Sequence, residues 1–384
     1  MSINHYKFLF TIIMGILVMF TGGNSIMAEN QVIKCMENGD LIYWEGDSII
    51  VRFAGKRHVL GSALYNGGFR QNLTAVLNHC TSDTKNTMTL ASYQNSMHDL
   101  CIKLGYNPDK VMTLGTSVPM ENAVICSEKY KSLEITAIVT AGAEGNPGRA
   151  GDNAFYPGLE IKGSPVKGTI NIMILFNADM PEGVLARATM TSTEAKTAAL
   201  QELMIGSRYS DGLATGTGTD QILIVSNPDS PLYVTDCGVH TKPGEILGRI
   251  VKKAVKEALL KQNGFNAAKM HSVFRRMERF GFRESVIKIH YKEMYGDDLS
   301  PETFQKLATA IDQKEDIVVL TSLFAHLTDQ YHWGLISFDE AKRNGLRILK
   351  EIVREDDFNP GNEKNLFAMY EKAYLILLNK ESKK

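Results

Sequence analysis

The segment 168–220 reads GTINIMILFNADMPEGVLARATMTSTEAKTAALQELMIGSRYSDGLATGTGTD, and it decides how the chain folds. Its apolar run at 170–176 has the length of a buried strand. Pro181 suits the first turn of a helix, because its φ is fixed and it has no N–H to leave unbonded. That helix is expected to run to about Met204, and 214–220 follows as a loop of alternating Thr and Gly. The segment predicts a strand, a long helix and a polar loop in succession.

The flanking segments extend this alternation of strands and helices. An amphipathic helix is expected at 244–262, with aliphatic side chains on one face and lysines on the other. Short helices are expected at 72–80 and 94–104. Further strands are expected at 49–53, 58–64, 87–90, 111–118, 134–140 and 221–226. Together these elements favour an α+β or mixed α/β domain at 29–264.

From residue 265 to 384 the sequence changes to helical patterns alone, and this part contains no cysteine. We therefore expect an all-α C-terminal module of unknown role. Its helices are expected at 267–276, 284–295, 301–311, 317–331, 338–354 and 365–378.

The first 28 residues look like a targeting segment. Residues 8–20 read FLFTIIMGILVMF, and His5 and Lys7 precede this run. The apolar run is short for a membrane span and has the length of a signal-peptide core. We expect 1–28 to be a signal peptide or a membrane anchor, which implies an exported or membrane-anchored, extracytoplasmic protein. A buried N-terminal helix is the alternative, although the run has no polar stripe.

Composition indicates a globular protein without a polyanion partner. The 384 residues are 44% hydrophobic and 22% charged, and the formal net charge is −1. No basic run predicts nucleic-acid binding. The five cysteines include no CxxC pair, and no HExxH motif or His/Cys cluster occurs, so we predict no metal site and no cofactor.

The helix after Pro181 carries polar side chains on the face that should pack inward. At 100° per residue, Thr189, Ser192, Thr193 and Lys196 cluster on one side with leucines. One interpretation is a polar stripe that lines a pocket. The other is that the hydroxyls bond to the preceding helical turn while the Lys side chain extends to solvent. Spacing alone leaves both open.

Two glycine-rich loops adjoin buried strands: 214–220 precedes the expected strand at 221–226, and 140–152 follows the expected strand at 134–140. In ATGTGTD, Gly216 and Gly218 free the backbone to approach a ligand, and the threonines at 215, 217 and 219 offer hydroxyls. The loop has neither the Gly-Lys-Ser/Thr of a P-loop nor the third glycine of a Rossmann turn, and a plain tight turn is the alternative. In the loop at 140–152, Arg149 is a candidate anchor for a carboxylate, an amide carbonyl or a phosphate. A solvent-exposed arginine is the alternative there.

His240 lies on a loop at the start of the amphipathic helix, and Glu245 is close to it in sequence. This is a suitable place for a general base. A lone histidine is more often structural, and Glu245 also suits the dipole of the helix N-terminus. His58 and His79 are the other candidates in this domain.

Several of these segments together resemble the adenosylcobinamide amidohydrolase family of corrinoid salvage. The resemblance covers about 40–262 and excludes both the N-terminal segment and the helical module. Its motifs are GTINIMILFNADM (168–180), ATMTSTEAKTAALQEL (188–203), LATGTGTD (213–220) and HTKPGEILGRIVKKAVKEAL (240–259), with LGSALYNGGF (60–69), GTSVPM (115–120) and TAGAEGNPGRAGD (140–152) upstream.

The resemblance implies hydrolysis of the amide that joins aminopropanol to a side chain of the corrin ring, which yields a cobyric acid. It implies a corrinoid substrate with or without the adenosyl group, and a catalytic domain at 29–264. An alternative is a corrinoid-binding protein of an uptake system that performs no hydrolysis. A third reading is an acyl-transfer enzyme that uses a Thr nucleophile on peptides. The helical module is then a candidate to dock a transporter, a membrane partner or a second subunit.

Amide hydrolysis needs a nucleophile, donors for the oxyanion and a proton for the leaving amine. A Thr such as Thr217 is one nucleophile, and water activated by His240 is the one we favour. Backbone N–H groups at 216–219 suit the oxyanion, Lys196 or His240 suits protonation of the amine, and Asp220 or Glu245 suits orientation of the base. We expect the polar helix after Pro181, the Thr–Gly loop and the segment at His240 to converge on one corrinoid side arm. Candidate substrate-binding residues are Asn146, Arg149, Asn171, Asn177, Thr193, Thr215, Gly216, Gly218 and Thr219.

Overall fold

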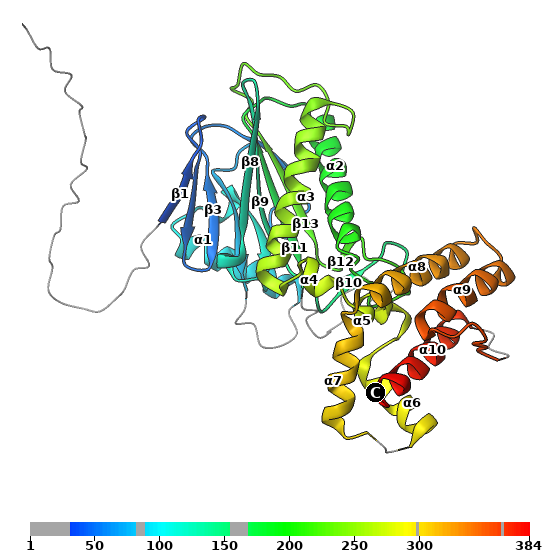
Figure 1. The fold of residues 1–384 in the computed structure, drawn as a ribbon. Helices are drawn as coiled ribbons and strands as arrows, with labels where there is room; N and C mark the ends of the chain where they lie inside the picture. The colour runs from blue at the N-terminus through cyan, green and yellow to red at the C-terminus, as the bar shows by residue number, and fades with distance from the viewer. Residues whose placement is uncertain (1–30, 82–88, 154–167, 297–298, 362–364) are drawn as a thin grey trace, which may run out of the picture.

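The computed structural model describes residues 31–81, 89–153, 168–296, 299–361 and 365–384. Two sheets form the frame of the domain at 31–263, here called the sheet domain (Figure 1). The larger has the strand order β5-β4-β13-β11-β9-β8, and within it only β11 and β13 pair in parallel. These strands are β4 (His58–Gly61), β5 (Gly68–Arg70), β8 (Val124–Tyr130), β9 (Leu133–Ala141), β11 (Ile170–Phe176) and β13 (Gln221–Ser226).

The smaller sheet has the order β1-β2-β3-β6-β7. Its strands are β1 (Gln31–Cys35), β2 (Leu41–Glu45), β3 (Ser48–Arg52), β6 (Ala75–Cys80) and β7 (Val111–Thr116). The two sheets pack on each other through alternate side chains. Met173 and Leu175 of β11 lie in the core between the sheets, whereas Ile172 and Ile174 face the other way. Because both faces of β11 are covered, its sequence is apolar almost throughout.

Helices cover the outer faces of both sheets and complete four layers. α2 (Glu182–Glu202) and α3 (Lys242–Asn263) lie side by side over the larger sheet, and α1 (Leu90–Lys103) packs on the smaller one (Figure 1). α3 buries the aliphatic face that its sequence predicts. Thr241 caps its start by accepting the N–H of Gly244, and Gly264 ends it at φ +66°.

Most expected elements of the sheet domain are confirmed, and β11 and β13 match their expected bounds. The expected helix at 72–80 is wrong, because β6 occupies 75–80 and pairs with both β3 and β7. The expected strand at 87–90 is wrong at its end, since Leu90 begins α1, and 87–88 lie outside the described residues. The strands β1, β2, β5 and β8 of the two sheets were not predicted.

The all-α expectation for the C-terminal part is confirmed at 273–381, here called the helical region, which has its own core of aromatic and aliphatic side chains. The expected helix at 267–276 is two, because Ser272 breaks the run and caps the second one. The helices are α4 (Ala267–Met270), α5 (Val273–Met277), α6 (Glu284–Tyr295), α7 (Pro301–Asp312), α8 (Glu315–His332), α9 (Phe338–Val353) and α10 (Leu366–Glu381).

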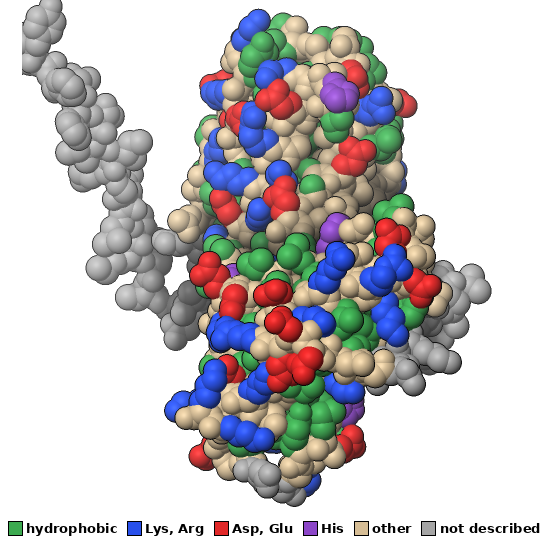
Figure 2. All heavy atoms as spheres, turned by 45° about the vertical axis from the view of Figure 1, so that its right-hand side comes forward, with side chains coloured by type: hydrophobic (Ala, Val, Ile, Leu, Met, Phe, Trp, Pro, Cys, Tyr) green, Lys and Arg blue, Asp and Glu red, His purple; other side chains and the backbone are tan. Residues whose placement is uncertain are grey.

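Charges of both signs are mixed on the face of the molecule drawn in Figure 2. On the face drawn in Figure 2, Lys and Arg side chains lie among Asp and Glu over both parts of the molecule. Among the described residues, no helix is long and apolar enough to span a membrane. The apolar segment at 8–20, for which we predicted a targeting role, falls outside them.

A buried ion pair joins the two sheets near the end of β13. Arg57 donates from Nε and Nη2 to Asp40 at 2.9 and 2.7 Å, and from Nη1 to Asn227 at 3.0 Å. The two charged side chains are only 2% and 3% exposed. A charge left alone in such a place is costly, because neither water nor a partner compensates it.

We therefore expect Asp40→Ala to lower the free energy of unfolding by about 3–5 kcal/mol, because it leaves the Arg57 guanidinium uncompensated. The control is Glu128→Ala, which removes a partly exposed partner of Arg249 and is expected to cost about 0–1 kcal/mol. Urea unfolding followed by circular dichroism measures both. Equal losses in the two variants would contradict the role given to the buried pair.

Candidate active site

The polar loops of the sheet domain meet at one edge of the larger sheet. The parallel strands β11 and β13 both begin at this edge, and β9 ends there, since Ala141 pairs with Ile170. Two short strands, β10 (Pro147–Gly148) and β12 (Gly216–Thr217), form a ribbon just beyond it (Figure 1). The ribbon brings the loop at 140–152 against the Thr–Gly loop, so the two glycine-rich segments of the sequence form one structure.

The carboxylate of Asp220 is the centre of this edge. Its Oδ2 accepts the Lys196 ammonium at 2.5 Å and the Thr217 N–H at 3.0 Å. Its Oδ1 accepts the Thr217 hydroxyl at 2.6 Å and the Ile170 N–H at 2.9 Å. The Lys196 and Asp220 side chains are 9% and 10% exposed, so the ion pair is largely shielded from solvent. Four donors on one carboxylate make this a fully bonded charged centre.

Glycines permit the close packing around Asp220. A Cβ on Gly216 would lie 2.5 Å from the Asp220 carboxylate and 2.7 Å from the Lys196 Nζ. Gly168 has φ +118°, and a Cβ there would lie 2.1 Å from the Asn146 amide oxygen. Gly218, in contrast, has open space where its Cβ would be. A side chain at position 216 or 168 would therefore have to displace Asp220, Lys196 or Asn146, whereas one at position 218 would not.

The loop hydroxyls are held by hydrogen bonds across the edge. Thr219 Oγ1 lies 2.6 Å from Thr169 Oγ1 and donates to the Gly168 carbonyl at 2.9 Å. The Asn146 amide donates to the same carbonyl at 3.0 Å. Thr215 Oγ1 accepts the N–H of Ala150 at 2.9 Å. Asn146, Thr215, Thr217 and Thr219 are thus gathered with Asp220 in one network.

The polar side chains of α2 support both interpretations of its sequence: two hydroxyls bond within the helix, and Lys196 reaches the Asp220 centre. Thr189 and Thr193 donate to carbonyls one turn back, at 3.1 and 2.9 Å, and Thr193 is exposed, so neither hydroxyl points to the Asp220 centre. Lys196 does reach that centre. Thr197, which sequence reasoning passed over, donates to the Thr215 carbonyl at 3.0 Å and ties the helix to the loop. Ser192 Oγ is buried and unbonded within the described part of the chain.

The other candidate binding residues lie at different distances from Asp220. Arg149 is at the ribbon, where its guanidinium donates to the Leu213 carbonyl at 3.2 Å. Asn171 lies at this edge but faces the smaller sheet, where it donates to Asn78 at 2.8 Å. Asn177 follows the far end of β11, about 20 Å away at 3.3 Å per residue, and bonds the backbone of Glu134 and Ser132. The structure does not group Asn177 with the site.

The structure does not bring the segment at His240 to the place where the polar helix and the Thr–Gly loop meet, so the predicted convergence is wrong for this segment. α3 has 22 residues, so its two ends lie about 33 Å apart. Its last residue, Asn263, accepts the Ala143 N–H at 3.0 Å beside the Asp220 edge. His240 precedes the first residue of α3 and is therefore at the opposite end, where it lines a surface hollow of about 190 Å³.

Glu245 stands with His240 at that far end of α3. It is exposed, and hydrogen bonds from Lys242 and then Arg249 lower its pKa. It belongs to a surface charge network and does not orient any group at the Asp220 edge. The sequence placed both residues near the motif loops, but the length of α3 separates them.

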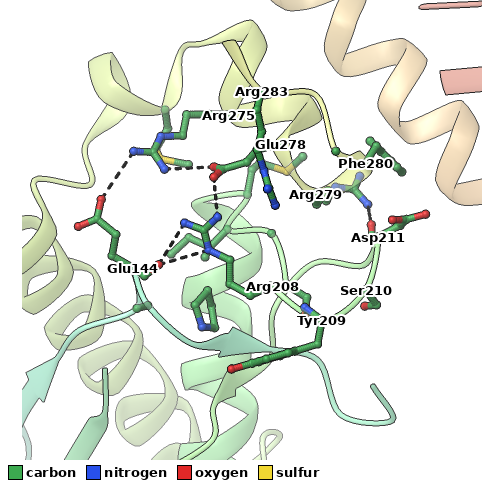
Figure 3. A pocket seen from close by; sticks show the side chains of 18 of the residues that line it. Glu144, Arg208, Tyr209, Ser210, Asp211, Arg275, Glu278, Arg279, Phe280 and Arg283 are labelled. Atoms are coloured by element: carbon green, nitrogen blue, oxygen red, sulfur yellow. Dashed lines mark hydrogen bonds and ion pairs between the residues drawn. The ribbon is translucent and has the colours of Figure 1, made fainter. Parts of the chain in front are cut away.

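A polar cavity of about 350 Å³ borders the ribbon on the side of the helical region (Figure 3). Sequence reasoning missed it, although the segment SRYSDG (207–212) between two predicted site elements was the available signal. Ser207 of this segment donates to Asp152 at 2.5 Å. Burial acts to raise the pKa of Asp152, but hydrogen bonds from Ser207, Ser210 and the Arg149 backbone outweigh it and lower the pKa.

Histidine, cysteine and acidic side chains do not gather anywhere in the described ranges as a group that would hold a metal ion. The groups that the Asp220 edge presents are a carboxylate, an ammonium, hydroxyls and backbone N–H groups. Such an arrangement suits proton transfer and the stabilisation of an oxyanion.

Comparison with known proteins agrees with this picture. The family model described as adenosylcobinamide amidohydrolase matches residues 34–267. An uncharacterized protein of Methanocaldococcus jannaschii is 34% identical over 231 residues, which is 57% of this chain and 88% of that protein. A crystal structure of a protein from Pyrococcus horikoshii aligns with 68% of this chain and 91% of its own, at 12% identity and a TM-score of 0.28. A likeness that low supports no conclusion about this chain.

The family match spans more than half of the 384 residues and contains the whole Asp220 edge with its loops. The four motifs at 168–180, 188–203, 213–220 and 240–259 all lie inside it. The match ends at the start of the helical region. On this evidence the chain belongs to the adenosylcobinamide amidohydrolase family.

Proposed function

We propose that this chain hydrolyses the amide linking aminopropanol to the corrin ring of cobinamide, with or without its adenosyl group, and releases the corresponding cobyric acid. The family supports amide hydrolysis on cobinamide in general. We assign the reaction to the Asp220 edge. The observation that carries this assignment is the Thr217 hydroxyl, bonded at 2.6 Å to a carboxylate that is itself paired with Lys196.

Thr217 is the proposed nucleophile and Asp220 its base. A hydroxyl attacks an amide only when a base within hydrogen-bond reach takes its proton, and Asp220 Oδ1 is in that position. The Thr217 oxygen bonds to the amide carbon while its proton passes to Asp220. Lys196 and the N–H groups of Thr217 and Ile170 hold the carboxylate in place for this transfer.

The same loop supplies donors for the oxyanion. Within the described residues, the backbone N–H groups of Gly218 and Thr219 donate to no other group. They follow the nucleophile directly and are free to bond the negative oxygen of the tetrahedral intermediate. Collapse of that intermediate breaks the C–N bond, and Asp220 returns its proton to the leaving amine. Water then attacks the Thr217 ester while its proton passes to Asp220; the ester C–O bond breaks, the Thr217 oxygen takes that proton back, and the carboxylic acid is released.

This mechanism replaces water activated by His240, which the sequence favoured. His240 precedes the first residue of α3, whereas the last residue of α3 bonds beside the Asp220 edge, and the hollow that His240 lines includes none of the residues bonded to Asp220. The proposed mechanism shares its Thr nucleophile with the acyl-transfer alternative. It differs in the substrate, which is a corrinoid amide and not a peptide.

Gly216→Ala tests the packing of the centre. The new Cβ would collide with both Asp220 and Lys196, so we expect kcat for cobyric acid release to fall about 100-fold, as displacement of a reacting group by 1 Å does. Gly248→Ala, a substitution in α3 with open space around it, is the control and should keep wild-type activity. Chromatography of the corrinoid products measures both. Full activity in Gly216→Ala would exclude this centre.

The variants Asp220→Asn and His240→Ala test which end of α3 holds the catalytic base. Without its base, Asp220→Asn should lose about 10²–10⁴-fold in kcat while it still binds cobinamide in equilibrium dialysis. His240→Ala should stay near wild type in both measurements. A severe loss of turnover in His240→Ala alone would restore the histidine mechanism. Binding without any hydrolysis by the wild type would favour the corrinoid-binding alternative.

We also propose that residues 1–28 export the chain or anchor it to a membrane, which leaves a corrinoid transporter as a candidate neighbour. The apolar run at 8–20 supports this. An enzyme outside the cytoplasm would meet corrinoid without the adenosyl group, since adenosylation takes place inside the cell. Fractionation of cells expressing the full chain should find it outside the cytoplasm, and removal of 1–28 should retain it inside. A cytoplasmic full-length chain would contradict this.

A further inference from the structure

The polar cavity beside the ribbon is shared by the two parts of the molecule (Figure 3). The sheet domain contributes Glu144 and 204–211, and the helical region contributes Arg275, Glu278 and Arg283. Its volume of about 350 Å³ is within the range of small-ligand sites. The residues from the helical region lie outside the family match at 34–267. This cavity is therefore a site that the family assignment does not describe.

Buried contacts fix the two walls against each other. Arg279, 2% exposed, pairs with Asp329 of α8 through both Nη atoms, at 2.5 and 2.7 Å. It also donates to the Asp211 carbonyl of the sheet domain. A Cβ on Gly206 would lie 2.8 Å from the Arg279 Cβ, so the two backbones approach closely there. The cavity is consequently formed before any ligand arrives.

The charges that line the cavity nearly balance. Arg208 donates to Glu278 at 2.6 Å, and Arg275 donates to the other oxygen of the same carboxylate at 3.4 Å. Arg275 also lies 3.8 Å from the Glu144 carboxylate. An anionic ligand such as phosphate would approach Glu144 and Glu278 as closely as the arginines. The arrangement fits a neutral polar ligand that has both carbonyl acceptors and N–H donors.

Among the described residues that line the cavity, Arg283 has a guanidinium without an ion-pair partner. It is exposed, caps the start of α6 without a side-chain bond, and makes no ion pair with any described residue. Figure 3 shows its guanidinium directed into the cavity, near Glu278 and Arg279. A guanidinium offers several N–H donors in a planar fork, which suits carbonyl oxygens.

We propose that this cavity binds the carboxamide-bearing edge of the corrin ring, with Arg283 donating to amide carbonyls and Glu144 and Glu278 accepting amide N–H groups. The proposal rests on the proposed function. Pro147 lines the cavity and pairs with Thr217 across the ribbon, so the backbone of one cavity residue lies one strand spacing, about 5 Å, from the backbone of the nucleophile. A corrin edge held there presents its aminopropanol arm to the Asp220 centre. The helical region is then a specificity element of the enzyme.

Arg283→Gln tests this inference, with Arg343→Gln, an exposed arginine on α9, as the matched control. Both are made in the full chain carrying Asp220→Asn, and equilibrium dialysis with cobinamide follows the corrinoid by its visible absorbance. Loss of a charged hydrogen bond predicts a dissociation constant raised about tenfold by Arg283→Gln and unchanged by Arg343→Gln. In the otherwise wild-type enzyme, Arg283→Gln should raise KM and leave kcat unchanged.

Equal affinities of the two variants for cobinamide would overturn the proposal. So would displacement of cobinamide by millimolar inorganic phosphate, because the cavity would then be an anion site. The binding measurement does not require hydrolysis. An enzyme that binds through Arg283 yet releases no cobyric acid would disprove the reaction and leave the binding site standing.

Discussion

The buried ion pair between Asp220 and Lys196 is the interaction on which the Asp220 edge depends. Four donors converge on one carboxylate, and they come from α2, from the Thr–Gly loop and from the first residue of β11. A charge at this depth needs all of them, since a missing partner leaves it uncompensated. The requirement fixes the loop against the helix, excludes a side chain at position 216, and places the Thr217 hydroxyl on a carboxylate oxygen.

Much of this edge was predictable from local sequence. The strands at 170–176 and 221–226 are apolar throughout, because sheets or helices cover both faces, and their bounds matched. The polar helix and the Thr–Gly loop both carry polar side chains that ordinary packing does not require. This correctly indicated that Lys196 and the loop meet. The prediction of a helix at 72–80 failed, because the periodicity of a short apolar run does not distinguish a helix from a strand. Pairing with β3 and β7 determines its conformation.

Long-range geometry set the limit of sequence reasoning. His240 lies only 20 positions after Asp220, but β13 carries the chain away from the Asp220 edge before His240 is reached, and α3 returns to that edge only after it, so the two residues lie at opposite ends of α3. The cavity residues escaped for a similar reason. Arg279 is 68 positions from Asp211 and 50 from Asp329, and no local pattern links such partners. These buried hydrogen bonds join the helical region to the sheet domain. The helical region thereby forms one wall of the polar cavity.

The most direct measurement is a crystal structure of the Asp220→Asn variant with cobinamide bound. The account predicts that the amide carbon of the aminopropanol arm lies about 3–3.5 Å from the Thr217 hydroxyl, with the corrin edge in the cavity beside Arg283. A corrinoid seated in the hollow at His240, or bound with its aminopropanol arm turned away from Thr217, would contradict the account.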